Sequence, residues 1–309
     1  MNRREFVAGT AALVLAPRAF ARARAPVVLV TADEESRVVA VDLGSGRVVR
    51  HIGTPAQPRS IETVGEVAVV AHTELGALSL VRGGRVRVLR GLAEPRYTAA
   101  HPNGRHAYVT DAARGEVVAI DVLRTRIIAR ERVGLHARHV TISPGGRTLW
   151  IALGSKAEVV AIVDVSTPTQ PRLRRAIHPP FLAHDVAWAP DGRRVWVSSG
   201  DRRELAVYHA RSGRIVARPE GDWPPQHVTF AGNRAYVTSG WSGTVRVHRV
   251  GGDELRSNPV PVGSYNVQAA AGRVVTPSLG RGTLTVLDPA GDTLYRVQVA
   301  RSSHDACIV

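Results

Sequence analysis

Apolar and polar positions alternate along the chain in short runs, and no stretch keeps the spacing of an amphipathic helix. One kind of run occurs as "HAYVTD", "TLWIAL", "RVWVSS" and "RAYVTS", and another as "VVAVD", "VVAID" and "LTVLD". Between the runs stand "HPNGR", "SPGGR" and "APDGR", which have the glycine and proline content of tight turns. The pattern predicts short β-strands joined by turns, and therefore an all-β protein.

The runs recur with a period of about forty residues. The residue just before the first apolar strand of each unit marks the copies, which are Ser60, Tyr97, His139, Asp185, His227, Asn266 and Asp305. Four short strands per unit at this period predict a seven-bladed β-propeller with four-stranded antiparallel blades. We expect residues 26–309 to form this single domain.

The last residues, "SSHDACIV", have the sequence of a first strand, whereas "VVLVTADEESRVVAVD", from residue 27 onward, supplies only the later strands of a blade. We therefore expect one blade to be built from both segments, with the C-terminal strand pairing with the N-terminal strands and closing the ring. Closure leaves no large open sheet edge. Cys307, the single cysteine, cannot form an internal disulfide and is predicted to be a small buried apolar residue.

Two segments, "AYVTDAARGEVVAID" and "ISPGGRTLWIAL", resemble the YVTN-type β-propeller repeat family. Residues 108–110 and 236–238 match its eponymous Tyr-Val-Thr, with Asp111 and Ser239 in place of its asparagine. The resemblance covers nearly all of residues 27–309. It implies an exported bacterial propeller of the broad lactonase- and quinoprotein-associated kind, and it implies little about function because such propellers serve many roles.

The first 25 residues are of a different kind. Arg3, Arg4 and Phe6 precede a short apolar stretch, and small residues offer cleavage sites at Ala21, Ala23 and Ala25. The apolar stretch is too short to span a membrane, so we expect no transmembrane anchor. The segment resembles a twin-arginine (Tat) signal, with Asn2 where serine or threonine is usual. It predicts export to the periplasm or the extracellular space by the twin-arginine route.

The formal net charge of +15 at pH 7 comes mostly from arginines that are scattered along the chain. A nucleic-acid site would need clustered basic residues with interleaved aromatic residues, so the charge does not indicate a nucleic-acid partner. The sequence contains no haem-attachment motif, no nucleophile elbow and no Walker loop. We expect a monomer whose partner is a small molecule or a protein that the sequence does not identify.

The starts of the innermost strands of a propeller meet at the mouth of its central channel. The two residues at these starts are not aliphatic in any unit. We expect the ligand-binding residues to be Tyr97, His139, His184, Asp185, His227, Asn266, His304 and Asp305, with Arg59, Arg96 and Arg138 as a positive arc and Trp241 as an aromatic lid. The arc favours a ligand with an anionic end. We also expect these side chains to be solvated, so that their replacement costs little stability.

Imidazoles and carboxylates around one axis also suit a divalent metal, and the predicted metal ligands are His139, His227, Asp185 and His304. A polar ring around a water-filled channel explains the same residues, and no ligand-spacing motif separates the two interpretations, so no cofactor is firmly implied. The favoured function is a non-catalytic ligand- or partner-binding protein acting through the channel mouth. A metal-assisted hydrolase of lactonase type is the alternative, and an accessory protein of a periplasmic redox system is a further one.

Overall fold

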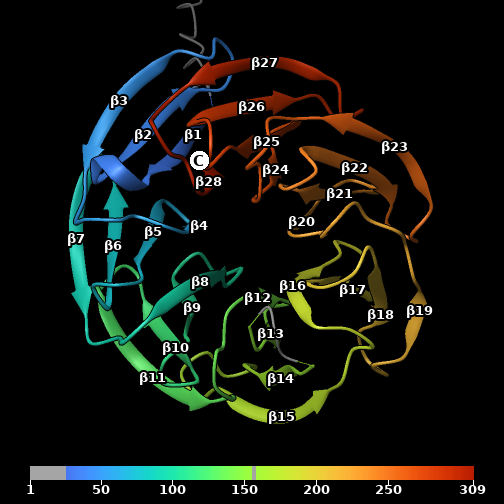
Figure 1. Cartoon of the computed structure of the whole chain (residues 1–309). Helices are drawn as coiled ribbons and strands as arrows, with labels where there is room; N and C mark the ends of the chain where they lie inside the picture. Colours follow the sequence, from blue (N-terminus) through green and yellow to red (C-terminus); the bar gives the residue numbers. More distant parts are fainter. Residues whose placement is uncertain (1–25, 155–157) are drawn as a thin grey trace, which may run out of the picture.

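The computed structural model describes residues 26–154 and 158–309. The predicted signal residues Arg3, Arg4 and Phe6 and the three predicted cleavage sites lie outside the described residues. Within the described ranges the chain forms seven four-stranded antiparallel sheets, arranged as blades around a central channel (Figure 1). The prediction of an all-β, seven-bladed propeller is confirmed. In the described part of the chain, no helix is long and apolar enough to cross a membrane.

The strands of each blade follow one another from the channel outward, except in blade 1. Blade 1 consists of β28 (Ala306–Ile308), β1 (Val27–Ala32), β2 (Arg37–Asp42) and β3 (Val48–Gly53), with the short 3-10 helix η1 (Asp33–Glu35) between β1 and β2. Blade 2 consists of β4 (Ile61–Val64), β5 (Val67–His72), β6 (Ala77–Arg82) and β7 (Arg85–Arg90). Blade 3 consists of β8 (Pro95–Ala100), β9 (His106–Asp111), β10 (Glu116–Asp121) and β11 (Arg126–Arg132).

The remaining blades have the same order. Blade 4 consists of β12 (Val140–Ile142), β13 (Thr148–Ala152), β14 (Val160–Asp164) and β15 (Arg172–Ile177). Blade 5 consists of β16 (Ala183–Trp188), β17 (Arg194–Ser199), β18 (Leu205–His209) and β19 (Ile215–Ala217). Blade 6 consists of β20 (Val228–Ala231), β21 (Arg234–Ser239), β22 (Thr244–Arg249) and β23 (Glu254–Pro259). Blade 7 consists of β24 (Gln268–Ala270), β25 (Arg273–Pro277), β26 (Thr283–Leu287) and β27 (Thr293–Gln298).

Blade 1 closes the ring in the predicted way. β28 pairs antiparallel with β1, and Cys307 lies opposite Leu29. Val27 and Val309 exchange two backbone hydrogen bonds, of 3.0 and 2.8 Å. The Cys307 side chain is fully buried in the apolar layer between blades 1 and 2, which confirms its predicted role as a small core residue. In Figure 1 the C-terminus accordingly lies beside β28, near the centre of the ring.

The core consists of apolar layers between neighbouring blades, and in blades 3 to 6 a repeated aromatic position contributes a large side chain to these layers. This position holds Tyr108, Trp150, Trp196 and Tyr236, which are fully buried, as expected of packing residues. The hydroxyl of Tyr236 donates to the Pro289 carbonyl of blade 7 at 2.6 Å. The indole N–H of Trp196 donates to the Val250 carbonyl of blade 6 at 3.2 Å. Tyr236 and Trp196 therefore fill the layer and also bind an outer turn of the neighbouring blade, whereas the indole N–H of Trp150 is buried without a hydrogen-bond partner among the described residues.

A second repeated link lies closer to the channel. The Thr110 hydroxyl in blade 3 donates to the Arg138 carbonyl at the entry of blade 4, at 2.5 Å. The Ser198 hydroxyl in blade 5 donates to the Gln226 carbonyl at the entry of blade 6, at 2.6 Å. Because these carbonyls belong to the residues just before the innermost strands, the links fix the backbone that carries the side chains of the channel.

Candidate functional site

Two rings of side chains project from the starts of the innermost strands. The first, called the inner ring, consists of the residues that mark the repeat: Ser60, Tyr97, His139, Asp185, His227, Asn266 and Asp305. The second, called the mouth ring, consists of the residues just before them: Arg59, Arg96, Arg138, His184, Gln226, Tyr265 and His304. A channel cavity of about 240 Å³ is lined by all of the inner ring except Ser60. A narrow cavity of about 10 Å³ is lined by four mouth-ring residues, Arg59, Arg96, Arg138 and His304, together with Tyr97.

The expectation that these groups are solvated is wrong. His139 is only 1% exposed, and Asp185, Asn266 and His304 are also buried. The strand ends of the blades converge at the centre of the ring, so each side chain there covers its neighbours. The channel is therefore largely desolvated, and electrostatic interactions in it are stronger than at a protein surface.

Three imidazoles from successive blades meet in the channel. His139, His184 and His227 have ring centroids 4.6 to 5.7 Å apart. One nitrogen atom of each ring lies within 4.8 Å of those of the other two, so the three side chains can hold a metal ion. The repeat pattern assigns His184 to the mouth ring and gives no sign that its imidazole reaches the inner one. His139 and His227 are two of the metal ligands predicted from the sequence. His184 is the third imidazole of the group, and the sequence analysis did not include it among the predicted metal ligands.

Burial determines the protonation of this triad. Burial, together with the charge of neighbouring Arg138, lowers the pKa of His184 to about 3. Burial also lowers the pKa values of His139 and His227 well below the usual range, and repulsion from neighbouring imidazoles adds to the effect. All three rings are therefore neutral at pH 7, which is the form in which imidazole binds metals.

The hydrogen-bonding state of His139 is unusual for so buried a group. Neither of its ring nitrogens has a hydrogen-bond partner among the described residues. An unpaired buried polar group costs about 1–3 kcal/mol, and such groups are rare in folded proteins. Its closest aromatic neighbour is Tyr97, whose ring centroid lies 4.0 Å away. His139 therefore reduces the stability of the channel as it stands, and its two nitrogens remain available to a ligand.

Two of the carboxylates that line the channel cavity, Asp185 and Asp305, link neighbouring blades. Asp185 Oδ2 accepts the Val228 N–H of blade 6 at 3.0 Å and lies 3.6 Å from His227 Nδ1. Asp305 Oδ2 accepts the Ile61 N–H of blade 2 at 3.0 Å. Burial raises the pKa of Asp185 to about 7 and that of Asp305 to about 8. Both side chains line the channel as predicted, and both also hold the ring together.

The remaining predicted residues lie around the mouth. Asn266 lines the channel cavity and donates its amide to the His304 carbonyl at 2.7 Å. Trp241, between β21 and β22, is 66% exposed, and its ring lies 6.2 Å from that of Tyr265 in the mouth ring. Trp241 is therefore at the rim, and its role as a lid stays a prediction.

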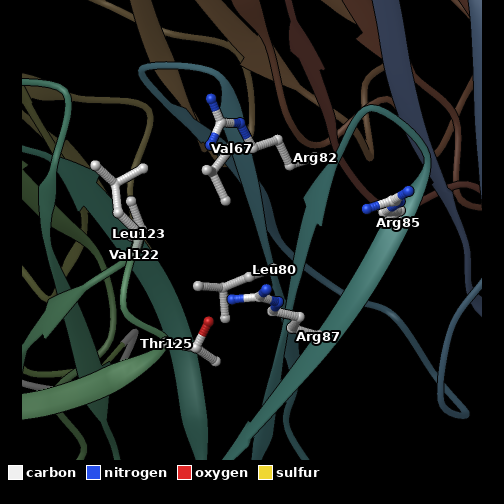
Figure 2. A pocket seen from close by; sticks show the side chains of 8 residues that line it. All are labelled: Val67, Leu80, Arg82, Arg85, Arg87, Val122, Leu123 and Thr125. Atoms are coloured by element: carbon white, nitrogen blue, oxygen red, sulfur yellow. The ribbon is translucent and has the colours of Figure 1, made fainter.

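A second basic hollow lies on the outside of the ring, between blades 2 and 3. It has a volume of about 450 Å³ and is lined by Arg82 of β6 and by Arg85 and Arg87 of β7, with Leu123 and other residues on the opposite wall. Figure 2 shows its guanidinium groups apart from one another along the strands. We call it the outer cleft. No feature of the repeat pattern points to it.

No protein-family model matches the sequence, and no curated protein matches it. The fold does resemble solved structures. One is Kuenenia stuttgartiensis hydrazine synthase, with a TM-score of 0.74, 17% identity, and coverage of 85% of this chain and 92% of that one. Another is a functionally unknown protein from Desulfotomaculum acetoxidans DSM 771, with a TM-score of 0.79, 13% identity, and coverage of 91% and 98%. A third is dihydro-heme d1 dehydrogenase NirN in complex with DHE, with a TM-score of 0.65, 15% identity, and coverage of 88% of this chain and 63% of that one. At these identities the likeness shows the fold.

Proposed function

We propose that this protein is an exported, non-catalytic binding propeller that holds a divalent first-row transition metal ion in its channel. The observation that carries the proposal is the triad of His139, His184 and His227, in which His139 is buried with both nitrogens unpaired. Neutral imidazole suits zinc, copper, nickel and iron better than magnesium or calcium. A bound ion would give His139 the partner that it lacks.

The geometry requires only a small adjustment on binding. Zinc–imidazole bonds of about 2.0–2.1 Å in a tetrahedral site place the nitrogens about 3.4 Å apart. The nitrogens of the triad lie within 4.8 Å of one another, so the rings need to turn or move inward by about an ångström. Three protein ligands leave at least one position for water or a ligand in the adjoining cavity. The carboxylate of Asp185, beside His227 Nδ1, would orient that imidazole.

Of the predicted metal ligands, Asp185 supports the triad from beside it. His304 lines the narrow cavity with the arginines and is not among the three grouped imidazoles. We therefore propose His139, His184 and His227 as direct ligands and Asp185 as the residue that positions His227. Binding of a further ligand at the open position by Tyr97, Asn266 and Asp305 belongs to the same proposal.

Metal analysis tests the function. The chain is expressed with residues 1–25 and recovered from the periplasm, and its metal content is measured by mass spectrometry. We expect one equivalent of a transition metal, which His139→Ala abolishes. The matched control is His209→Ala, because His209 is an exposed imidazole whose Nδ1 bonds to the Ser212 hydroxyl. A metal-free protein that also fails to bind added zinc, copper or nickel at micromolar concentrations would contradict the proposal.

The alternative functions differ in what the loaded protein does. For the lactonase-type hydrolase, Asp185 near a metal-bound water is the supporting observation, and hydrolysis of a lactone panel by the loaded protein would favour it. For the redox accessory role, the support is the fold shared with a dehydrogenase of dihydro-heme d1. Copurification with a periplasmic redox enzyme would favour that role. Membership of the YVTN-type repeat family stays a prediction.

A further inference from the structure

A cluster of three arginines marks the mouth of the channel. Arg59, Arg96 and Arg138 come from blades 2, 3 and 4 and occupy the same position of the repeat. They line one narrow cavity with His304 and Tyr97. Guanidinium groups repel one another at such proximity, so a fold that gathers three of them needs a compensating negative charge.

The surrounding carboxylates compensate this charge only in part. Glu94 lies 3.3 Å from the guanidinium of Arg96, and Asp33 attracts Arg59. Burial, together with repulsion from Arg138 and Arg59, still lowers the pKa of Arg96. Among the described residues, no carboxylate lies within ion-pair distance of Arg138, and its Nε is buried without a hydrogen-bond partner.

A second unpaired donor or acceptor faces the same cavity. His304 is only 8% exposed, and its Nδ1 has no hydrogen-bond partner among the described residues. An oxyanion can accept hydrogen bonds from Arg138 Nε and from the Nδ1–H tautomer of the neutral His304 ring together, and the bond to the charged guanidinium is of the strong, charge-assisted kind. The cavity therefore offers positive charge and unused hydrogen-bonding groups at one point.

The space available limits the size of the occupant. The narrow cavity of about 10 Å³ has room for about one water-sized group. On the same face, a cleft of about 450 Å³ is lined by Arg59, Arg96, Thr73, Glu74 and Glu94, and its volume is that of an ordinary small-molecule pocket. The two hollows share Arg59, Thr73 and Arg96. A ligand can therefore place one oxygen atom of an anionic group in the narrow cavity and its body in the cleft.

We propose that Arg59, Arg96, Arg138 and His304 form an oxyanion subsite at the channel mouth, for the carboxylate or phosphate end of a small molecule. Tyr97 lines both the narrow cavity and the channel cavity, so it lies between this subsite and the imidazole triad. The subsite is distinct from the metal site because the two share no ligand residue. The ligand enters from the mouth face, and its anionic end stops at Tyr97.

Titration calorimetry at low ionic strength tests the subsite, with citrate and inorganic phosphate as separate probes. The protein is first freed of metal by chelation and dialysis, so that a failure here is distinct from a failure of the metal site. We expect one saturable site for at least one probe. Citrate alone identifies a carboxylate subsite, and phosphate alone identifies a phosphate subsite. Arg138→Gln should weaken binding by about tenfold to a hundredfold, and Arg138→Lys by less, because lysine keeps the charge and loses the fork.

Arg87→Gln is the matched control, because Arg87 belongs to the outer cleft, which is also basic (Figure 2). The outer cleft and the cleft at the channel mouth both have a volume of about 450 Å³. This variant should bind the probe as the parent does. Arg59→Gln gives an independent test if Arg138→Gln loses the circular dichroism of the parent. Equal weakening by Arg87→Gln, or no saturable binding of either probe at millimolar concentrations, would overturn the proposal.

Discussion

Removal of residues 303–309 is a direct test of how the ring is held closed. The deletion takes away β28, and with it the acceptors of three backbone N–H groups. Val27 N–H donates to the Val309 carbonyl at 3.0 Å, Thr31 N–H to the Asp305 carbonyl at 2.9 Å, and Ile61 N–H to the Asp305 carboxylate at 3.0 Å. It also exposes the apolar layer between blades 1 and 2 that Cys307 covers.

The size of the effect follows from these contacts. Each N–H left buried without an acceptor costs about 1–3 kcal/mol. Loss of Ala306 and Cys307 from their apolar layers adds about 1 kcal/mol or more for each. The total is on the order of 5–10 kcal/mol, which is comparable with the whole stability of a typical domain, about 5–15 kcal/mol. We therefore expect the truncated chain to be largely unfolded at room temperature.

Thermal unfolding followed by circular dichroism is the assay. The parent should show one cooperative transition and the truncated chain none. A synthetic peptide of residues 302–309, added to the truncated chain, should restore a transition because it supplies the missing strand. Cooperative melting of the truncated chain at the parent temperature would refute the closure argument, since blade 1 would then be stable without its innermost strand.

Four further predictions concern the channel and the signal. In metal-free protein, His139→Leu should raise the melting temperature by removing two unpaired polar atoms while abolishing metal binding; a lower melting temperature would contradict this. Because the folded state keeps His184 neutral, the stability of metal-free protein should fall as the pH drops from 6.5 towards about 3, and His184→Gln should flatten that slope in urea titrations. The pH dependence that Asp305 causes has the opposite sign, because the folded state raises the pKa of this carboxyl. Its contribution to the free energy of unfolding falls as the pH rises from 3.8 to about 8, and Asp305→Asn should remove that decline. Replacing Arg3 and Arg4 by lysine should keep the precursor in the cytoplasm, as fractionation would show, because the receptor reads the guanidinium fork; normal export in a Tat-deficient strain would contradict it.

The fold could be predicted because the sequence pattern of a four-stranded blade recurs several times along the chain. The same landmarks recur in several blades, and each landmark has a physical cause that recurs with it. The tyrosine and tryptophan positions fill the layers between blades, and the threonine of Tyr-Val-Thr bonds to the entry of the next blade, as Thr110 does. The hydrogen bond made by the threonine could also have been predicted from the sequence. A hydroxyl residue recurs at this position, which the alternation of apolar and polar residues places in the core.

The site could be predicted only as a set of positions. The repeat aligns His139, Asp185 and His227 on one ring, but it does not tell how closely side chains from different blades approach. That depends on the width of the channel and on the rotamer of each residue. For the same reason, the sequence did not indicate that the inner ring is buried or that the imidazole of His184 lies beside those of His139 and His227. The outer cleft is lined by residues of blades 2 and 3, and it had no signal in the sequence either.

Two histidines show why the channel is the part of the molecule that demands a functional explanation. His72 is fully buried, and both of its nitrogens are bonded, to the Ala56 carbonyl at 2.9 Å and the Ser79 hydroxyl at 2.8 Å. His139 is equally buried and has no bond from either nitrogen among the described residues. The first is what folding alone produces when an imidazole is enclosed. The second lowers stability at a place where raised carboxylate pKa values and clustered arginines lower it further. An imidazole buried with both nitrogens unpaired, beside carboxylates and an arginine whose pKa values burial shifts, is best explained by a ligand that binds there.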